Sequence, residues 1–490
     1  MRLCTVFLTR EAGGFGWPYL GHDDAKNADS IAGRLRDRFP DIEFTSNMLV
    51  TRKDHSEIWE IKNEIDRSDG LLVFVIGNPT FVDVGVEFIE VGKPTILANY
   101  IYGGDQGFIR IYERVRGRGL RVLPVSSTDF ADVERAVELL KGLISLRGKK
   151  ILIFTFDLPE VSRGEEELRR ISDLLGSGLD ELDEGTMKSI APLVAERKLR
   201  IDVHGSDQAV QWRRNETKYR ENLRKTFGLE MVRPTPDELR AYFEKVDEIE
   251  AARIAEKWIN NAKEVNASRH VIHNSAKLYL ALKQFMKYAD CDAVGIECYP
   301  VLVSGRLSAF PCLAFFELNN EGSTAVCEAD MDSCVSMLLG RYVAGRPGHV
   351  SNYSLDTSHN RATYLHCVAP NKPYGPSGPT LGYSISPHGE AHSVGASPEV
   401  EFPSGEDITT IKVSVFAGKM LLRHGKSLGS VKDEKACRDK LLVETNARTI
   451  LERHDHDTFG WHTVSFLGDL REDFIAAAKL LGLEIVEEDR

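Results

Sequence analysis

The chain has 490 residues, of which 42% are hydrophobic and 28% are charged, and its formal net charge is −12. A chain of this length exceeds what one hydrophobic core supports, so we expect about three domains. The negative charge argues against nucleic acid as a partner, because the phosphate backbone would be repelled.

The N-terminal segment MRLCTVFLTREAGG does not read as a secretory signal peptide, because its apolar stretch is short and an acid follows at once. The longest apolar runs, such as 71–77 and 313–316, have the length of strands and fall far below a membrane span. Eight cysteines are scattered without CxxC or other ligand spacing. We therefore expect a cytoplasmic protein with reduced thiols and no membrane partner, and a zinc–cysteine site is the less favoured alternative.

Short apolar runs alternate with helical patterns over residues 1–148. Strands are expected at 3–8, 42–50, 71–77, 95–100 and 121–125, and helices at 24–38, 55–67, 106–116 and 129–146. Continuous apolar runs such as GLLVFVIG are typical of buried parallel strands. The alternation predicts an N-terminal Rossmann-like α/β domain with a doubly wound parallel sheet.

A second doubly wound α/β domain is expected over residues 149–310, beginning with the buried strand KKILIFTF. Further elements are expected as strands at 200–203 and in AVGIECY, and as helices at 163–175, 207–227, 235–262 and 270–289. The third helix has a start signal at Thr235, with proline in the first turn and acids near the helix dipole.

Residues 311–490 form the expected C-terminal domain. A helix over 332–344 precedes short alternating segments, and 409–416 with 419–424 reads as a hairpin around Ala417 and Gly418. The predicted fold class is therefore α/β, with two doubly wound parallel-sheet domains followed by a mainly antiparallel, barrel-like β domain.

Two glycine-rich loops, 11–18 and 102–107, follow predicted strands. Neither contains GxGxxG or a Gly-Lys-Ser/Thr motif, so neither indicates a nucleotide cofactor. Ligands of α/β sheets gather at strand ends, and we expect the loops to line a pocket.

The segment CEADMD places Glu328, Asp330 and Asp332 directly before an apolar helix. The helix dipole explains the two aspartates. It explains Glu328 less well, because this residue ends a buried strand and buried acids need a partner.

Nine of the fourteen histidines lie from His349 onward. The relevant ones are His366 in YLHCVAP, His388 in SPHGE and His462 in FGWHTVSFLGD. A histidine taken alone is more often a hydrogen-bonded structural residue than a ligand.

Several segments of the C-terminal part resemble the L-fucose isomerase and L-arabinose isomerase superfamily, most nearly its fucose isomerase-like branch. They are DAVGIECYP, NNEGSTAVCEADMDSCVSMLLGRYVAGRPG, LHCVAP, SPHGE and WHTVSFLGD. The resemblance implies a metal-dependent aldose–ketose isomerase that acts on a small sugar, uses Mn²⁺ and forms a trimer or hexamer.

The resemblance also implies roles for individual residues. The family's metal-binding glutamate and C-terminal histidine fall on Glu328 and His462, while its aspartate falls on Asn352. An asparagine can offer its carbonyl oxygen to a hard cation but cannot act as a base; Asp356 could take that place if the loop shifts. The implied metal ligands are Glu328, Asn352 and His462, the catalytic residues Glu328, Asn352 and Asp330, and the sugar-binding residues His366, His388 and Glu390.

Isomerisation moves a proton between adjacent sugar carbons through an enediolate, which requires acid/base groups and benefits from a cation at the neighbouring oxygens. Two other functions stay open. Because asparagine replaces aspartate, the same scaffold could support an epimerase or a lyase. A non-catalytic sugar-binding protein is the third possibility, since a fold does not fix a function.

Overall fold

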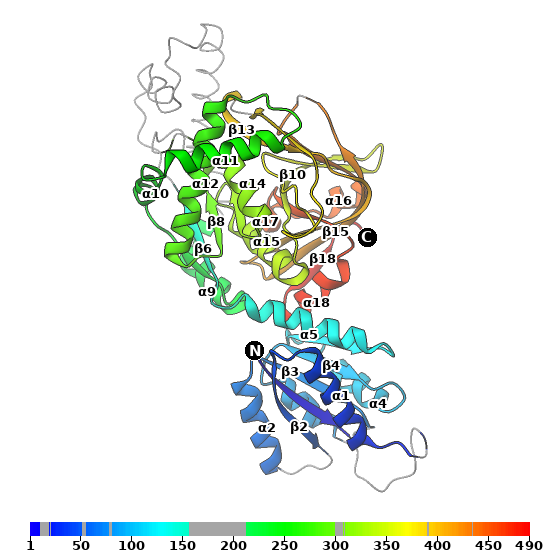
Figure 1. The fold of residues 1–490 in the computed structure, drawn as a ribbon. Coiled ribbons are helices and arrows are strands. Elements are labelled where there is room, and N and C mark those ends of the chain that lie inside the picture. Colours follow the sequence, from blue (N-terminus) through cyan, green and yellow to red (C-terminus); the bar gives the residue numbers. More distant parts are fainter. Residues whose placement is uncertain are drawn as a thin grey trace, which may run out of the picture. The chain divides into compact units, whose positions relative to one another are not determined.

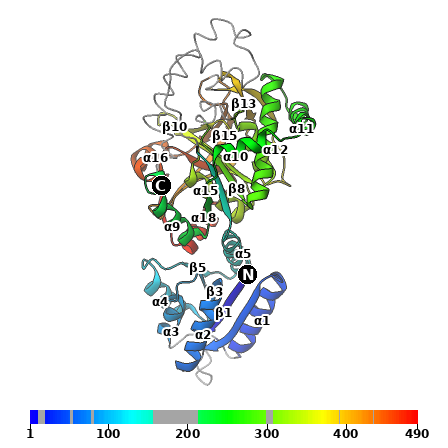
Figure 2. The ribbon, with the colours of Figure 1, turned by 90° about the vertical axis from the view of Figure 1, so that its left-hand side faces the viewer.

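The computed structural model describes residues 1–9, 19, 21–50, 55–77, 81–155, 212–298, 307, 309–389, 392–433 and 435–490. These residues form two compact units (Figures 1 and 2). Unit 1 comprises Met1–Arg147 and Glu472–Glu484, and unit 2 comprises Gly148–Arg471 and Ile485–Arg490. A boundary between a middle and a C-terminal domain near residue 311 stays a prediction.

Unit 1 contains a five-stranded sheet in the order β2-β1-β3-β4-β5. The strands are β1 (Arg2–Leu8), β2 (Glu43–Val50), β3 (Gly70–Val75), β4 (Thr95–Asn99) and β5 (Val122–Ser126). All neighbouring strands are parallel, as predicted. Every residue of β3 is buried, so both faces of the sheet centre are covered.

Helices complete unit 1. They are α1 (Asp24–Arg38), α2 (His55–Arg67), α3 (Val82–Ile89), α4 (Asp105–Val115), α5 (Phe130–Ser145) and most of α18 (Arg471–Leu481). The last of these comes from the far end of the chain, and Arg135 on α5 binds Asp473 on α18 with an Nε···Oδ1 distance of 3.0 Å.

The second glycine-rich loop has a packing explanation. A Cβ atom at Gly103 or Gly104 would collide with the carbonyl oxygens of Ile76 and Val75, directly after β3. Only glycine permits this close approach of two backbone segments. The first glycine-rich loop, 11–18, lies outside the described residues.

Unit 2 begins with a parallel sheet in the order β7-β6-β8-β9. Its strands are β6 (Lys150–Phe154), β7 (Glu230–Val232), β8 (Ala293–Ile296) and β9 (Thr324–Cys327). The associated helices are α9 (Glu216–Phe227), α10 (Pro236–Phe243), α11 (Glu248–Asn261), α12 (Arg269–Ala289), α14 (Cys312–Asn320) and α15 (Met331–Ala344). A second parallel sheet was predicted, and it is confirmed.

One detail of this region differs from the sequence prediction. The helix expected over 235–262 is two helices, because Asp247 caps a new helix start by accepting from the backbone N–H groups of Ile249 and Glu250. The start signal at Thr235 is a complete capping box with Glu238. The strand-length run 313–316 lies in helix α14. The elements expected at 163–175 and 200–203 lie outside the described residues.

The rest of unit 2 is antiparallel. Six strands close into a barrel in the order β14-β17-β10-β11-β16-β15, and the β14–β15 hairpin joins the ends. They are β10 (His349–Asp356), β11 (Arg361–His366), β14 (Ser404–Ser414), β15 (Lys419–Ser430), β16 (Asp439–Glu444) and β17 (Thr463–Leu467). The predicted barrel-like antiparallel region and its hairpin at Gly418 are thus confirmed.

Further elements accompany the barrel, which Figure 1 draws in yellow to red. They are the hairpin β12 (Tyr383–His388) and β13 (His392–Val400), strand β18 (Glu484–Glu487) beside β15, and the short helices α16 (Ala447–Arg453) and α17 (His456–Phe459). None of the described helices combines the length and the hydrophobicity that a bilayer-crossing segment requires.

The inner face of the barrel carries a line of polar side chains beside apolar ones such as Leu441 and Val443. Arg423 on β15 stacks 4.2 Å from the ring centre of Tyr353 on β10, and these strands are not neighbours, so both side chains point inward. On the same face, Ser351 pairs with Thr463 and His366 pairs with Asp439. Ile411 on β14 pairs with Val464 on β17, which places Lys412 opposite Thr463. Asn352 on β10 pairs with Leu365 on β11, which places Ser351 opposite His366. The alignment therefore crosses five strands. We call the resulting line the inner row: Lys412, Thr463, Ser351, His366 and Asp439.

The outer face is apolar where it meets α15. A Cβ atom at Gly340 would overlap the ring of Phe466, and one at Gly348 would overlap Val464. The barrel is therefore packed from outside by a helix, and its polar row faces inward beside the turn that precedes the same helix.

Candidate metal centre

The turn between β9 and α15 holds two residues in the left-handed region. Glu328 has φ 59° and Ala329 has φ 51°. Each such residue costs about 1 to 3 kcal/mol unless it is glycine, and such strain concentrates at functional sites. Trp212 holds the turn by donating its indole N–H to the carbonyl of Ala329 at 3.0 Å. The backbone is thus fixed in a conformation that brings Glu328 beside the end of the barrel.

Glu328 meets two histidines from the barrel. The Oε1 atom of Glu328 lies 3.6 Å from Nε2 of His366 and 3.8 Å from Nε2 of His462. The two imidazole rings are 5.0 Å apart and nearly perpendicular, at 82°. The three potential ligand atoms all lie within 4.8 Å of one another.

This arrangement fits a divalent cation. The two separations are too long for good hydrogen bonds. They are close to the roughly 3 to 3.5 Å between atoms that bind one ion at about 2.1 Å each. One carboxylate and two imidazoles form a donor set that suits transition metals such as manganese, iron and zinc. A small inward movement of the side chains would complete the three contacts.

The centre is open on the side of Glu328. Side-chain exposure is 23% for Glu328, against 3% for His366 and 1% for His462. Burial acts to raise the pKa of Glu328, but His462 and His366 oppose it, and the pKa lies below its ordinary value. Glu328 is therefore ionised at neutral pH, which is the form that binds a cation.

His462 is oriented by Asp330. Its Nδ1 lies 3.0 Å from Oδ2 of Asp330, which directs Nε2 toward Glu328. A carboxylate that accepts from Nδ1 leaves the lone pair on Nε2, as a metal ligand requires.

The oxygens of Asp330 are occupied within the protein. Oδ2 also accepts from Lys412 Nζ at 2.7 Å and from the hydroxyl of Ser333 at 2.7 Å, while Oδ1 accepts from the backbone N–H of Ser333 at 2.9 Å. Burial acts to raise the pKa of Asp330, but Lys412 and His462 hold it well below its ordinary range. These contacts favour a positioning role for Asp330 over the catalytic role that the sequence predicted.

Asn352 pairs with Leu365 on β11, whereas Ser351 and His366 lie on the other face of these strands. His462, which belongs to the group, directly precedes Thr463, the partner of Ser351, so the register does not separate Asn352 from the centre. The role of Asn352 as a cation ligand stays a prediction. Asp356 does not take its place, because it is exposed at the end of β10 and bonds Ser358 and His359.

The remaining predicted residues have separate positions. His388 is buried on β12 and stacks on Phe310, with ring centres 4.7 Å apart and planes 13° apart. Glu390 lies outside the described residues. His366, expected to bind sugar, instead belongs to the group that could hold the cation.

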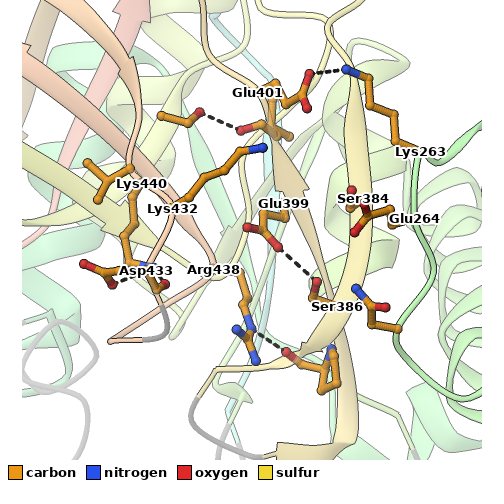
Figure 3. A pocket seen from close by; sticks show the side chains of 15 residues that line it. Lys263, Glu264, Ser384, Ser386, Glu399, Glu401, Lys432, Asp433, Arg438 and Lys440 are labelled. Carbon is orange, nitrogen blue, oxygen red and sulfur yellow. Dashed lines mark hydrogen bonds and ion pairs between the residues drawn. The ribbon is translucent and has the colours of Figure 1, made fainter.

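A separate cavity of about 580 Å³ lies between the β12–β13 hairpin and β16 (Figure 3). Several of its polar side chains are bonded within the protein: Lys263 binds Glu401, Ser386 donates to Glu399 at 3.0 Å, and Arg438 donates to the carbonyl of Pro387 at 2.8 Å. We call this cavity the hairpin pocket. None of the three potential metal ligands lines it.

The chain is similar to sulfoquinovose isomerases. It is 23% identical over 224 residues to those of Priestia aryabhattai and Priestia megaterium (strain ATCC 12872 / QMB1551), a match that covers 45% of this chain and 49% of theirs. It is 24% identical over 230 residues to that of Clostridium sp. (strain MSTE9), covering 42% of this chain and 46% of the relative. The chain thus spans about half the length of the curated relatives it matches. No model of a known protein family matches it.

These relatives carry the name of a sugar isomerase, the class that the sequence predicted. Placement in the fucose isomerase-like branch stays a prediction. Sequence reasoning missed the position of His366 beside Glu328 and the contact of Lys412 with Asp330, because both depend on strand register. A signal for Lys412 exists: a lysine within the apolar strand TTIKVSVF needs a buried acid as partner.

Proposed function

We propose that the protein is a metal-dependent aldose–ketose isomerase whose divalent cation is held by Glu328, His366 and His462. One observation carries the proposal: a carboxylate and two imidazoles from three separate segments converge within 4.8 Å at the end of a barrel. The left-handed turn at Glu328 and the support of His462 by Asp330 add to it.

The side chains of the centre have different roles in the proposed reaction. A divalent cation at this centre would supply Lewis acidity toward two adjacent sugar oxygens. His462 and His366 hold that position, and Asp330 fixes the orientation of His462. Oε1 of Glu328 faces the imidazoles, so we assign to Oε2 the transfer of a proton at the sugar carbons. Asp330 cannot share this task, because its oxygens are engaged by Lys412, Ser333 and His462.

The substrate in this proposal is a free or derivatised aldose. The names of the relatives make sulfoquinovose the first sugar to test, and the motif resemblance adds L-fucose and L-arabinose. Manganese as the metal, a trimeric or hexameric assembly and a cytoplasmic location stay predictions from the sequence.

The test combines metal analysis with product analysis. We expect the purified full chain to bind one divalent ion per centre and, when loaded with Mn²⁺, to convert at least one of the three aldoses to its ketose. Glu328→Gln should abolish the conversion, while Glu399→Gln in the hairpin pocket serves as the matched control and should retain it. A Mn²⁺-loaded protein that forms no ketose from any of them would contradict the proposal.

Product analysis also separates the alternative enzymes. The described centre offers Glu328 as its one carboxylate on the open side, and a single proton-handling group also suits epimerisation or carbon–carbon cleavage. Formation of an epimer or of shorter sugar fragments in the same assay would favour an epimerase or a lyase. Sugar-dependent thermal stabilisation without any product would favour a binding protein.

A further inference from the structure

The two histidines of the candidate centre differ in how Nδ1 is held. Nδ1 of His462 lies 3.0 Å from Asp330, whereas Nδ1 of His366 is buried and has no hydrogen-bond partner among the described residues. A buried polar atom without a partner costs about 1 to 3 kcal/mol. Metal-binding histidines nearly always donate their second ring N–H to a carboxylate, a carbonyl or water. His366 therefore lacks the support that its neighbour has.

A matching acceptor lies directly opposite on the next strand. Asp439 on β16 pairs with His366 on β11, and its side chain is fully buried. Oδ1 of Asp439 accepts from the backbone N–H of Val400 at 2.7 Å, but Oδ2 is also buried without a partner among the described residues. Directly opposed residues of an antiparallel pair have Cβ atoms about 4.5 to 5.5 Å apart. The two buried side chains are therefore direct neighbours on the inner face of the barrel.

We propose that Asp439 positions His366 as Asp330 positions His462. In this arrangement Nδ1–H of His366 donates a hydrogen bond to Oδ2 of Asp439. The inference rests on the proposed metal centre and deepens it. Each histidine would then be held between a cation on Nε2 and a carboxylate at Nδ1, which fixes the tautomer and the ring plane of both. Asp439 itself would touch neither cation nor sugar.

Ser351 is the rival acceptor. It flanks His366 from β10 in the inner row, and its buried Oγ likewise has no partner in the part of the chain that the structure describes. A carboxylate is the stronger acceptor for an imidazole that carries positive charge from a bound cation. The carboxyl group of Asp439 is favoured over the hydroxyl of Ser351 for this reason, and Ser351→Ala becomes the matched control.

The experiment measures Mn²⁺ affinity of the full chain by isothermal titration calorimetry. Asp439→Asn keeps an oxygen for Val400 but turns an NH₂ group toward His366, so we expect the dissociation constant to rise about 10- to 100-fold. Ser351→Ala should change it by less than about threefold, since it removes no carboxylate. Thermal unfolding of the metal-free proteins should be similar for both variants, which separates a positioning role from a general loss of structure.

Two results would overturn the inference. One is unchanged Mn²⁺ affinity in a folded Asp439→Asn protein. The other is a larger loss in Ser351→Ala than in Asp439→Asn. If Asp439→Asn does not fold, Asp439→Glu retains the carboxylate and should bind Mn²⁺ more tightly than Asp439→Ser; equal affinity would count against the inference. Absence of Mn²⁺ binding in the unmodified protein is a different outcome, because it would remove the proposed function itself.

Discussion

The hairpin pocket and the candidate metal centre contrast in how their polar groups are satisfied. In the pocket, lysine, arginine and glutamate side chains bond one another or a backbone carbonyl, as Figure 3 shows. At the centre, a carboxylate faces two imidazoles at 3.6 and 3.8 Å, too far for good hydrogen bonds. Four buried atoms of the inner row, on His366, Asp439, Ser351 and Thr463, lack partners among the described residues.

This contrast shows that a cavity lined by polar groups is not by itself a binding site for a cation. Several polar groups of the pocket already bond within the protein. The centre instead places one carboxylate and two imidazoles within 4.8 Å of one another. Buried polar groups without partners are costly, so their concentration beside one carboxylate is the more informative signal.

Removing the charge of Glu328 is the strongest test of the difference between the candidate metal centre and the hairpin pocket. Glu328→Gln should lower kcat by about 10²- to 10⁴-fold, because it removes a ligand and a proton-transfer group together. Glu399→Gln, which alters the Ser386 contact in the hairpin pocket, should stay within about twofold of the parent, since it touches no reacting atom. Steady-state ketose formation measures both. Similar losses in the two variants would erase the distinction between the regions.

Lys412 tests whether the support behind His462 is essential to the fold. Lys412→Met leaves Asp330 as a buried charge without its cation, so the free energy of unfolding should fall by about 3 to 5 kcal/mol. Exposed Lys432 of the hairpin pocket is the control, and Lys432→Met should stay within about 0.5 kcal/mol. Urea denaturation of both proteins gives the values. A Lys412→Met protein as stable as the parent would show that Asp330 finds another partner.

Metal removal tests the centre without a mutation. A ligand present at 100 times its dissociation constant stabilises the folded state by about 2.7 kcal/mol. Dialysis against a chelator should therefore lower the melting temperature of the parent, and Mn²⁺ should restore it. Glu328→Gln should lose most of this shift, whereas Glu399→Gln should keep it. A melting temperature that is indifferent to Mn²⁺ would contradict the assignment.

The smallest expected effect is on stability, and it is tested at two hydroxyl pairs on the inner face of the barrel. Thr410 and Ser465 bond each other at 2.8 Å, whereas Ser351 and Thr463 are equally buried and unpartnered among the described residues. Thr410→Val should cost about 1 kcal/mol or more of stability, because Ser465 loses its partner. Ser351→Ala should be neutral or stabilising in the metal-free protein. Equal losses in chemical denaturation would show that Ser351 is already satisfied.

The sequence predicted the layers of the fold and part of the site. Continuous apolar runs such as GLLVFVIG identified parallel strands, because burial on both faces leaves a local trace. The break between α10 and α11 was missed, since the cap at Asp247 lies within a longer helical pattern. Glu328 and His462 were selected by motif resemblance.

The rest of the site could not be predicted from the sequence, because it depends on how the strands pair. Asn352 and Ser351 are adjacent, and a difference of one residue moves a side chain to the other face of a strand. Local periodicity cannot show which of the two faces His366, because that depends on how β10 and β11 pair. The contact of Lys412 with Asp330 joins segments 82 residues apart and is likewise visible only in three dimensions.

The composition of unit 1 bears on how the protein is made. Its residues Glu472–Glu484 are synthesised after the part of unit 2 that runs up to Arg471. A nascent chain emerging from the ribosome therefore presents Met1–Arg147 without the ion pair between Arg135 and Asp473 for most of translation. Domains generally fold in order of synthesis. Here unit 1 lacks Glu472–Glu484, and with them the partner of Arg135, until those residues are made.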